Sequence, residues 1–117
     1  MNVYIDDLRD PAKYLSPELA KDIVWIKKWW DAKNFLFDNH DKIEVIHFDH
    51  YMDERHHTGG DLLEMVYFGK LYSDEFPLLK TVYLHSSDET TVERLIERFN
   101  VKFIKHGVEM INNYQRF

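Results

Sequence analysis

Short apolar runs alternate along the chain with longer amphipathic segments. The runs are rich in Val, Ile, Tyr and Phe, residue types that favour strands. Their apolar character is nearly continuous, which is typical of strands that are covered on both faces of a parallel sheet. We therefore predict five strands, at Asn2–Ile5, Ile23–Trp25, Ile43–Phe48, Lys80–His85 and Val101–Ile104.

The segments between these runs favour helices. Apolar residues recur three and four positions apart in Asp88–Phe99, with charged residues on the opposite face, and this periodicity indicates an amphipathic helix. Gly60–Leu71 and Asp31–Asn39 carry a similar stripe and are predicted to be helical. The alternation of strands and helices predicts one α/β domain that spans residues 1–117.

The first connection between strands is unusual. Two prolines, Pro11 and Pro17, interrupt the segment Leu8–Asp22, and only Ser16–Lys21 is suited to a helical turn. We therefore expect a shortened first crossover.

Composition narrows the function classes. The chain has 117 residues, which suits one domain, and no cysteine, so disulfides, cysteine-ligated metals and thiol nucleophiles are excluded. Any metal must bind oxygen or imidazole. The 15 Lys and Arg against 21 Asp and Glu give a net charge of −6, which disfavours binding to duplex DNA. No run is long enough for a membrane helix or signal peptide, so we expect a cytoplasmic protein without a membrane partner.

Charged and polar side chains follow four of the predicted strands. They are Asp6 and Asp7 after the first strand, Asp49 and His50 after the third, His85, Ser86 and Ser87 after the fourth, and Lys105 after the fifth. Ligands of open parallel sheets bind at the carboxyl ends of the strands, where the strand order reverses. In a five-stranded sheet of order 2-1-3-4-5 this point lies between strands one and three, so Asp6, Asp7 and Asp49 are expected to converge.

Three converging carboxylates suit a divalent cation. An all-oxygen site favours Mg²⁺ or Mn²⁺, with waters and a phosphate oxygen completing the shell. Ser86 or Ser87 then hydrogen-bonds the phosphate, and Lys105 supplies the opposite charge. The pattern predicts a site for metal and phosphate.

The same residues are also suited to structural roles that need no ligand. An Asp-Asp pair at a strand end is also typical of a turn, and Ser87 or Asp88 is suited to cap the following helix. Lys105 is also typical of a solvated surface charge. His47 is expected to pack in the core, and the three tryptophans favour packing over a base-stacking platform.

Asp6 with Asp7, Asp49, Ser86 and Lys105 resemble the site of the receiver domain of two-component signalling. That family has an acidic pair after the first strand, a phospho-accepting Asp after the third, Ser or Thr after the fourth and Lys after the fifth. The resemblance implies a receiver-like, flavodoxin-like sheet and a site that Asp49 shares with a metal.

The chain is still more similar to the cyclic-phosphate processing receiver domain. The motifs that carry this resemblance are Asp6-Asp7-Leu8-Arg9 with Pro11, Asp49-His50, Gly59-Gly60-Asp61 and His85-Ser86. That branch usually continues Asp-His with a second Asp, whereas Tyr51 stands here and Asp53 is the nearest replacement. The resemblance implies a substrate with a cyclic phosphate, on a small molecule or an RNA end.

The histidines after the third and fourth strands favour hydrolysis of a cyclic phosphate over phosphorylation of Asp49. Imidazole titrates near neutral pH, so His50 and His85 are candidates for moving protons between water and the leaving oxygen, and Arg9 is a candidate for binding phosphate. The alternative is a regulatory receiver-like module, phospho-accepting at Asp49 or inactive, that binds a protein partner. Its contact surface would be the helix around Val92–Phe99 or the tail Tyr114–Phe117.

Overall fold

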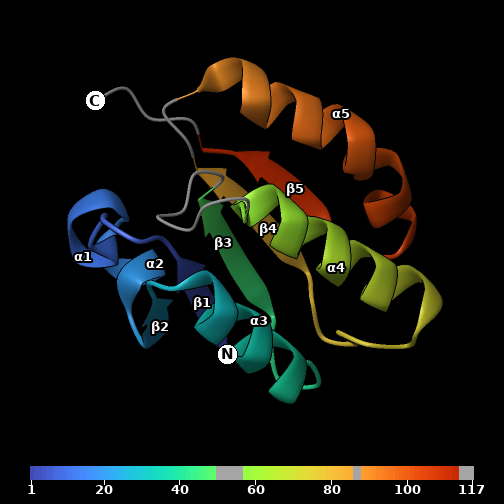
Figure 1. Cartoon of the computed structure of the whole chain (residues 1–117), viewed down its shortest axis with the longest axis horizontal. Coiled ribbons are helices and arrows are strands. Elements are labelled where there is room, and N and C mark those ends of the chain that lie inside the picture. The colour runs from blue at the N-terminus through green and yellow to red at the C-terminus, as the bar shows by residue number, and fades with distance from the viewer. Residues whose placement is uncertain (50–56, 86–87, 114–117) are drawn as a thin grey trace.

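Five parallel strands form the centre of the molecule. A computed structural model of the chain describes residues 1–49, 57–85 and 88–113. Its strands are β1 Asn2–Ile5, β2 Ile23–Ile26, β3 Val45–Asp49, β4 Thr81–His85 and β5 Glu109–Asn112. They pair in parallel in the order β2-β1-β3-β4-β5, which confirms the predicted α/β class and strand order (Figure 1). The first four predicted strands are confirmed, with ends that differ by at most two residues.

Helices connect the strands. They are α1 Pro11–Tyr14, α2 Pro17–Ala20, α3 Trp29–Asp38, α4 Gly59–Tyr72 and α5 Glu89–Lys105. The first two have four residues each, so the first crossover is short, as the prolines predict. The prediction that only Ser16–Lys21 forms a helical turn is wrong, because Pro11 begins α1 after the N-cap Asp10. Over the part of the chain that the structure describes, no helix has the length and apolar character needed to cross a membrane.

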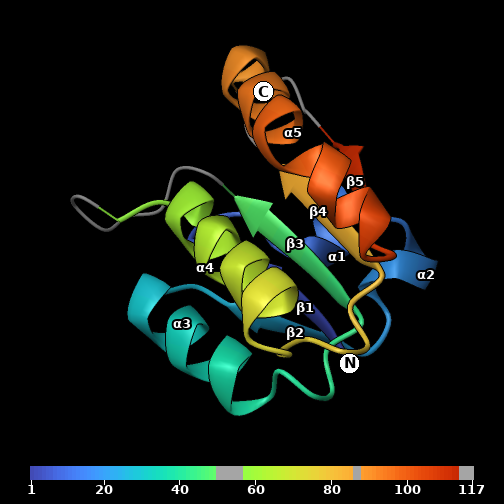
Figure 2. The same ribbon diagram turned by 90° about the vertical axis from the view of Figure 1, so that its right-hand side faces the viewer.

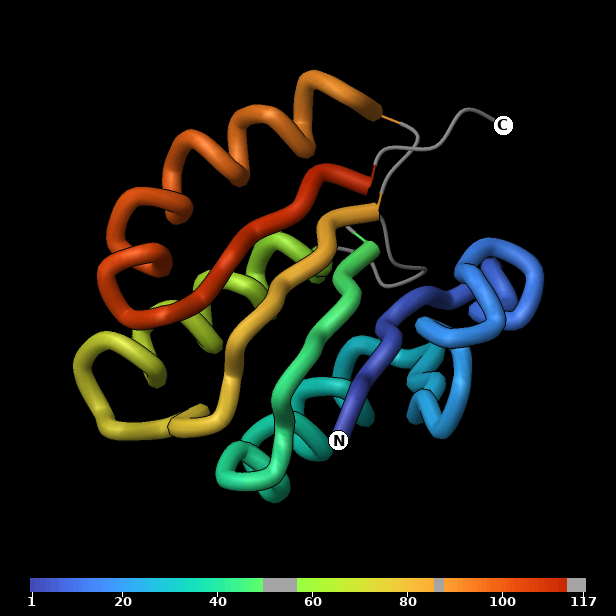
Figure 3. Tube along the Cα trace, turned by 180° about the vertical axis from the view of Figure 1, so that it is seen from behind, coloured from blue at the N-terminus to red at the C-terminus, as the bar shows by residue number. Residues whose placement is uncertain are grey.

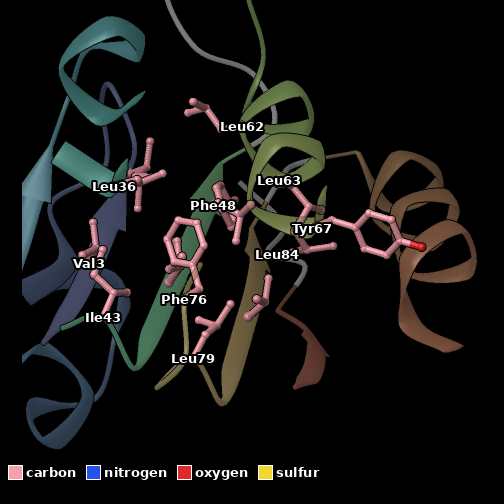
Figure 4. Packing of buried hydrophobic residues seen from close by; sticks show 14 of the residues in the cluster. Val3, Leu36, Ile43, Phe48, Leu62, Leu63, Tyr67, Phe76, Leu79 and Leu84 are labelled. Atoms are coloured by element: carbon pink, nitrogen blue, oxygen red, sulfur yellow. The ribbon is translucent and has the colours of Figure 1, made fainter. Parts of the chain in front are cut away.

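Helices α3, α4 and α5 lie against one face of the sheet (Figure 2). The strand residues that face them belong to the buried core, together with Leu36, Leu63 and Phe76 (Figure 4). Seen from behind, no helix of the described residues lies in front of strands β3, β4 and β5, and α1 and α2 lie beside β1 (Figure 3). The prediction that strands are covered on both faces is confirmed for β3, whose five residues are all buried. The long helices nevertheless lie on one face, because the short first crossover supplies only two helical turns to the other.

The fifth strand lies elsewhere than predicted. Val101–Ile104 belongs to the last turns of α5, and the strand is Glu109–Asn112. Phe99 and Phe103, four positions apart, continue the buried stripe of α5, whereas Val101 and Ile104 are exposed. The apolar run therefore follows helical periodicity, and its β-branched residues do not decide the local structure.

Gly107 marks the end of α5. It adopts a positive φ of 77°, and its N–H donates to the carbonyl of Ile104, while Val108 N–H donates to the carbonyl of Phe103. This pair of hydrogen bonds is a Schellman motif, which glycine favours because it has no Cβ. A Lys-His-Gly sequence thus signals a helix end here.

Candidate functional site

Three carboxylates meet at the carboxyl ends of β1 and β3. Asp6 and Asp7 directly follow β1, and Asp49 is the last residue of β3, the strand beside it. One carboxylate oxygen from each lies within 4.8 Å of the others. Asp6 and Asp49 are buried, at 1% and 5% exposure. The structure therefore brings together the three acids that the strand ends indicate.

Asp6 also has a structural role in the turn after β1. Its Oδ1 accepts hydrogen bonds from the backbone N–H groups of Leu8 and Arg9, both at 2.9 Å. Tyr4 donates its hydroxyl to Asp6 Oδ2 at 3.4 Å, and the Trp25 indole N–H donates to the Asp6 carbonyl at 2.8 Å. The turn role and a ligand role are compatible, because each carboxylate oxygen has more than one lone pair.

The donor set fits a small, hard divalent cation. Mg²⁺ binds oxygens at about 2.1 Å in an octahedron, so two ligand oxygens on one ion lie roughly 3 to 4 Å apart. One oxygen from each of the three carboxylates lies within 4.8 Å of the others, which is compatible with this spacing. Gathering three negative charges without a cation is unfavourable, so such a cluster gains from binding one.

Two buried histidines lie next to this cluster. His47 in β3 and His85 at the end of β4 lie on the sheet face opposite α3, α4 and α5, and His47 Nδ1 lies 2.8 Å from His85 Nε2. Asn113, just after β5, places its side-chain nitrogen 3.2 Å from His85 Nδ1. If the Asn113 amide donates there, His85 Nε2 carries the proton and donates it to His47. Both ring nitrogens of His85 thus contact protein groups.

Aromatic rings surround these histidines. The ring of His47 stacks on Tyr83, with centroids 4.4 Å apart and planes 4° apart. Tyr4 packs against both imidazoles at 5.7 and 5.6 Å. The histidines are consequently almost completely removed from solvent.

Burial controls the protonation of this group. It lowers the pKa of His47 to about 4. Burial, followed by the charges of His47 and Arg9, lowers the pKa of His85 to about 3. The pKa of Tyr4 is raised well above its usual range, first by burial and then by the negative charge of Asp6. Both imidazoles and the phenol are therefore neutral at pH 7.

Arg9 supplies positive charge at this site. Its charge lowers the pKa of both Tyr4 and His85, so the guanidinium lies close enough to act on these two groups. The turn that Asp6 holds fixes the Arg9 backbone. A guanidinium held beside carboxylates is well suited to bind a phosphate, as the sequence predicts for Arg9.

Lys105 does not take part in this arrangement. It was expected after the fifth strand, but it lies in the last turn of α5 and is exposed. The chain then turns into β5, whose first residue Glu109 pairs with Thr81, the first residue of β4. Lys105 thus lies at the amino ends of the strands, away from the carboxylates, because the predicted fifth strand is the end of a helix. Asn113 occupies the position after β5.

Three further predicted site residues, His50, Ser86 and Ser87, lie outside the described residues. Asp88 caps α5, since its carboxylate accepts from the backbone N–H and the hydroxyl of Thr91. This confirms one of the two capping residues that the sequence indicates.

Tyr4 and Asn113 are site residues that the sequence does not predict, and His47 is buried as predicted but also contacts His85 in the site. Tyr4 precedes Asp6 by two positions, His47 precedes Asp49 by two, and Tyr83 precedes His85 by two. Residues two apart in a strand share a face, so this repeat was a visible signal that one face is polar. Asn113 had no such signal, because it follows a strand that was placed elsewhere.

Comparison with known families gives one match. A family model described as the cyclic-phosphate processing receiver domain matches residues 1–100. No curated protein and no solved structure matches the chain. The matched range includes the acidic cluster and both buried histidines but ends before β5.

Proposed function

Because the chain belongs to the cyclic-phosphate processing receiver domains, we propose that it is a metal-dependent phosphoesterase that opens a cyclic phosphate on a nucleotide or an RNA end. The observation that carries this proposal is the convergence of Asp6, Asp7 and Asp49 at the carboxyl edge of the sheet. A receiver-like sheet alone would not indicate a reaction, because folds of this type host many functions.

The three carboxylates would hold Mg²⁺ or Mn²⁺. The bound ion would supply Lewis-acid polarisation of the phosphoryl group. Arg9 would bind a phosphate oxygen and stabilise the negative charge that develops on it. In this proposal Ser86 and Ser87 remain candidates for further phosphate hydrogen bonds.

The reaction needs one proton to move. Water attacks phosphorus, one bond from phosphorus to a ribose oxygen breaks, and the water proton ends on that oxygen, which gives a phosphomonoester. We assign the transfer to His50, which follows Asp49 in the chain: its imidazole takes the proton from water and gives it to the leaving oxygen. His85 was predicted to share this task, but its low pKa and its contacts with His47 and Asn113 favour a neutral, positioning role.

The proposal is tested with 2′,3′-cyclic nucleotides and Mg²⁺. We expect conversion to a monophosphate, reduced at least roughly 100-fold in Asp49→Asn, because catalytic groups commonly contribute two or more orders of magnitude. Asp41→Asn is the matched control: it removes an exposed carboxylate outside the site and should retain full activity. In the same protein, Mg²⁺ should shift the backbone NMR signals of Asp6, Asp7 and Asp49.

Two results would contradict the enzyme. One is that the folded protein, with metal bound, hydrolyses none of a panel of cyclic phosphates. The other is stable phosphorylation of Asp49 by acetyl phosphate, lost in Asp49→Asn, which would favour the phospho-accepting module. Lys105 lies at the amino ends of the strands, so neither interpretation uses it as the cation of the site.

A further inference from the structure

A groove opens between the first half of α3 and helix α4, on the face of the sheet that the helices cover. It encloses about 360 Å³, which lies within the range of small-molecule sites. Its walls are aromatic and charged side chains from both helices and from His57 before α4. The two helices run side by side (Figures 1 and 2). None of the roles assigned above uses this groove.

The walls of the groove present flat aromatic surfaces. Trp30 and Phe68 are about half exposed, at 49% and 47%, which is high for such large apolar side chains. His57 stacks on the buried Trp29 at 4.3 Å and meets Trp30 edge-on at 5.2 Å. Trp29 is itself fixed, because its indole N–H donates to the Thr58 carbonyl at 2.9 Å. The groove is thus preformed and suited to hold a planar ring.

Charged groups also line the groove. Asp61 and Glu64 contribute two carboxylates and Lys33 one ammonium, whose Nζ lies 5.1 Å from the centre of the Trp30 ring. Arg98 pairs with Glu64 at 2.9 Å, so the charges around the groove balance. A neutral ring that carries amino groups suits the groove, because carboxylates accept hydrogen bonds from exocyclic amino groups such as that of cytosine.

The groove lies near the acidic cluster. The carbonyl of Ile26 at the end of β2 accepts a hydrogen bond from Asp6 N–H at 3.1 Å, and Trp29 follows only three residues later. Three residues span at most roughly 11 Å between Cα atoms. This limit joins Ile26, which contacts Asp6, to Trp29 in the wall of the groove, so the groove lies at the same end of the sheet as the acidic cluster.

We propose that this groove binds the nucleobase of the substrate and prefers bases with an exocyclic amino group, such as cytosine, over uracil. The inference rests on the proposed function, since the substrate must be a nucleotide or an RNA end for a base to be present. Trp30 and Phe68 stack on the ring, and Glu64 and Asp61 accept hydrogen bonds from its amino group.

The experiment uses nucleosides without phosphate, so that it does not depend on turnover. Binding of cytidine and uridine is measured by equilibrium dialysis and by NMR shifts of Trp30, Phe68 and His57. We expect cytidine to bind at least about fivefold more tightly than uridine, and Trp30→Ala to weaken cytidine binding roughly 5- to 150-fold. Val101→Ala changes an exposed apolar residue of α5 that does not line the groove, and it should leave binding unchanged.

Glu64 offers a matched pair of variants. Its Oε2 forms an ion pair with Arg98 at 2.9 Å, so Glu64→Ala and Arg98→Ala break the same bridge. Only the first removes a carboxylate from the groove. We expect Glu64→Ala to reduce the preference for cytidine, and Arg98→Ala to retain it.

The outcomes separate this inference from the proposed function. Hydrolysis of 2′,3′-cyclic CMP at the same rate as a cyclic phosphate of ribose alone, with no nucleoside shift at the groove, would overturn the inference and leave the enzyme intact. Nucleoside binding at the groove without hydrolysis of any cyclic phosphate would support the nucleobase site and contradict the proposed phosphoesterase activity. Shifts of the groove signals with protein concentration alone would assign the groove to a second copy of the chain and overturn the base site.

Discussion

The two faces of the sheet differ in chemistry although their residues alternate along the same strands. Towards α3, α4 and α5 the strands present Val, Ile, Leu and Phe, which form one apolar core. On the other face β1, β3 and β4 present tyrosines and histidines, and the line of side chains leads to the carboxylates at the strand ends. The apolar core, Tyr4 and both histidines are buried, but only the polar groups require hydrogen-bond partners inside the protein.

This difference separates stability from chemistry within one sheet. The apolar face contributes through burial and close packing, which do not depend on pH. The polar face holds neutral histidines whose charged forms burial disfavours, so its contribution depends on pH. The two faces should therefore respond to different perturbations.

Removing a ring from the apolar face should have the largest effect. Phe48 in β3 is 1% exposed, so Phe48→Ala leaves a cavity and should lower the free energy of unfolding by about 3 to 5 kcal/mol. Urea denaturation at pH 7 measures this change. Leu78→Ala, at a residue that is 53% exposed, is the control and should change stability by less than about 1 kcal/mol. An equal loss in both variants would contradict the assignment of the core.

Acid should destabilise the polar face. In the unfolded chain a histidine titrates near pH 6.5, whereas the pKa of His47 is lowered to about 4 in the folded protein. Between these values the unfolded state binds more protons, so stability is full above about pH 6.5 and falls as the pH decreases. For His47 alone the loss between pH 7 and pH 4 is about 3 kcal/mol.

The measurement is the slope of unfolding free energy against pH for the wild type and for His47→Gln. Carboxylates titrate in both proteins, so the difference between the two slopes isolates the histidine. Parallel slopes between pH 6.5 and pH 4 would show that His47 is not buried in the neutral form.

Removal of a charged side chain that lies on neither face of the sheet should have the smallest effect on stability and activity. Lys105 is exposed in the last turn of α5, so Lys105→Ala should change stability by less than about 0.5 kcal/mol and leave the hydrolysis of cyclic nucleotides unchanged. Activity assays beside thermal unfolding check both parts. A large loss of activity would return Lys105 to the site, where the sequence alone had placed it.

Local sequence was sufficient for most of the sheet and for the acidic cluster. Apolar runs bounded by turn residues predicted β1 to β4, and the order of a receiver-like sheet placed Asp6 and Asp7 beside Asp49. This succeeds because the carboxyl ends of parallel strands share one edge, so residues far apart in sequence meet there once the order is known.

Strand β5 shows where local sequence fails. Val101–Ile104 has strand-like composition, yet the buried positions of Phe99 and Phe103 extend α5 through it. The actual strand, Glu109–Asn112, is short and partly exposed at the edge of the sheet, so it lacks a continuous apolar run. Because the fifth strand was predicted at the wrong residues, Lys105 was predicted to lie in the site and Asn113 was not.

By itself the sequence determined the class of fold and the gathering of three carboxylates, because both follow from patterns local to each strand and from the geometry common to parallel sheets. Only the tertiary structure decided which face of the sheet is polar, how His47 contacts His85, and that a groove lies between α3 and α4. These features depend on pairs of residues distant in sequence, such as His85 and Asn113, whose contact exists only after the strands have packed in register.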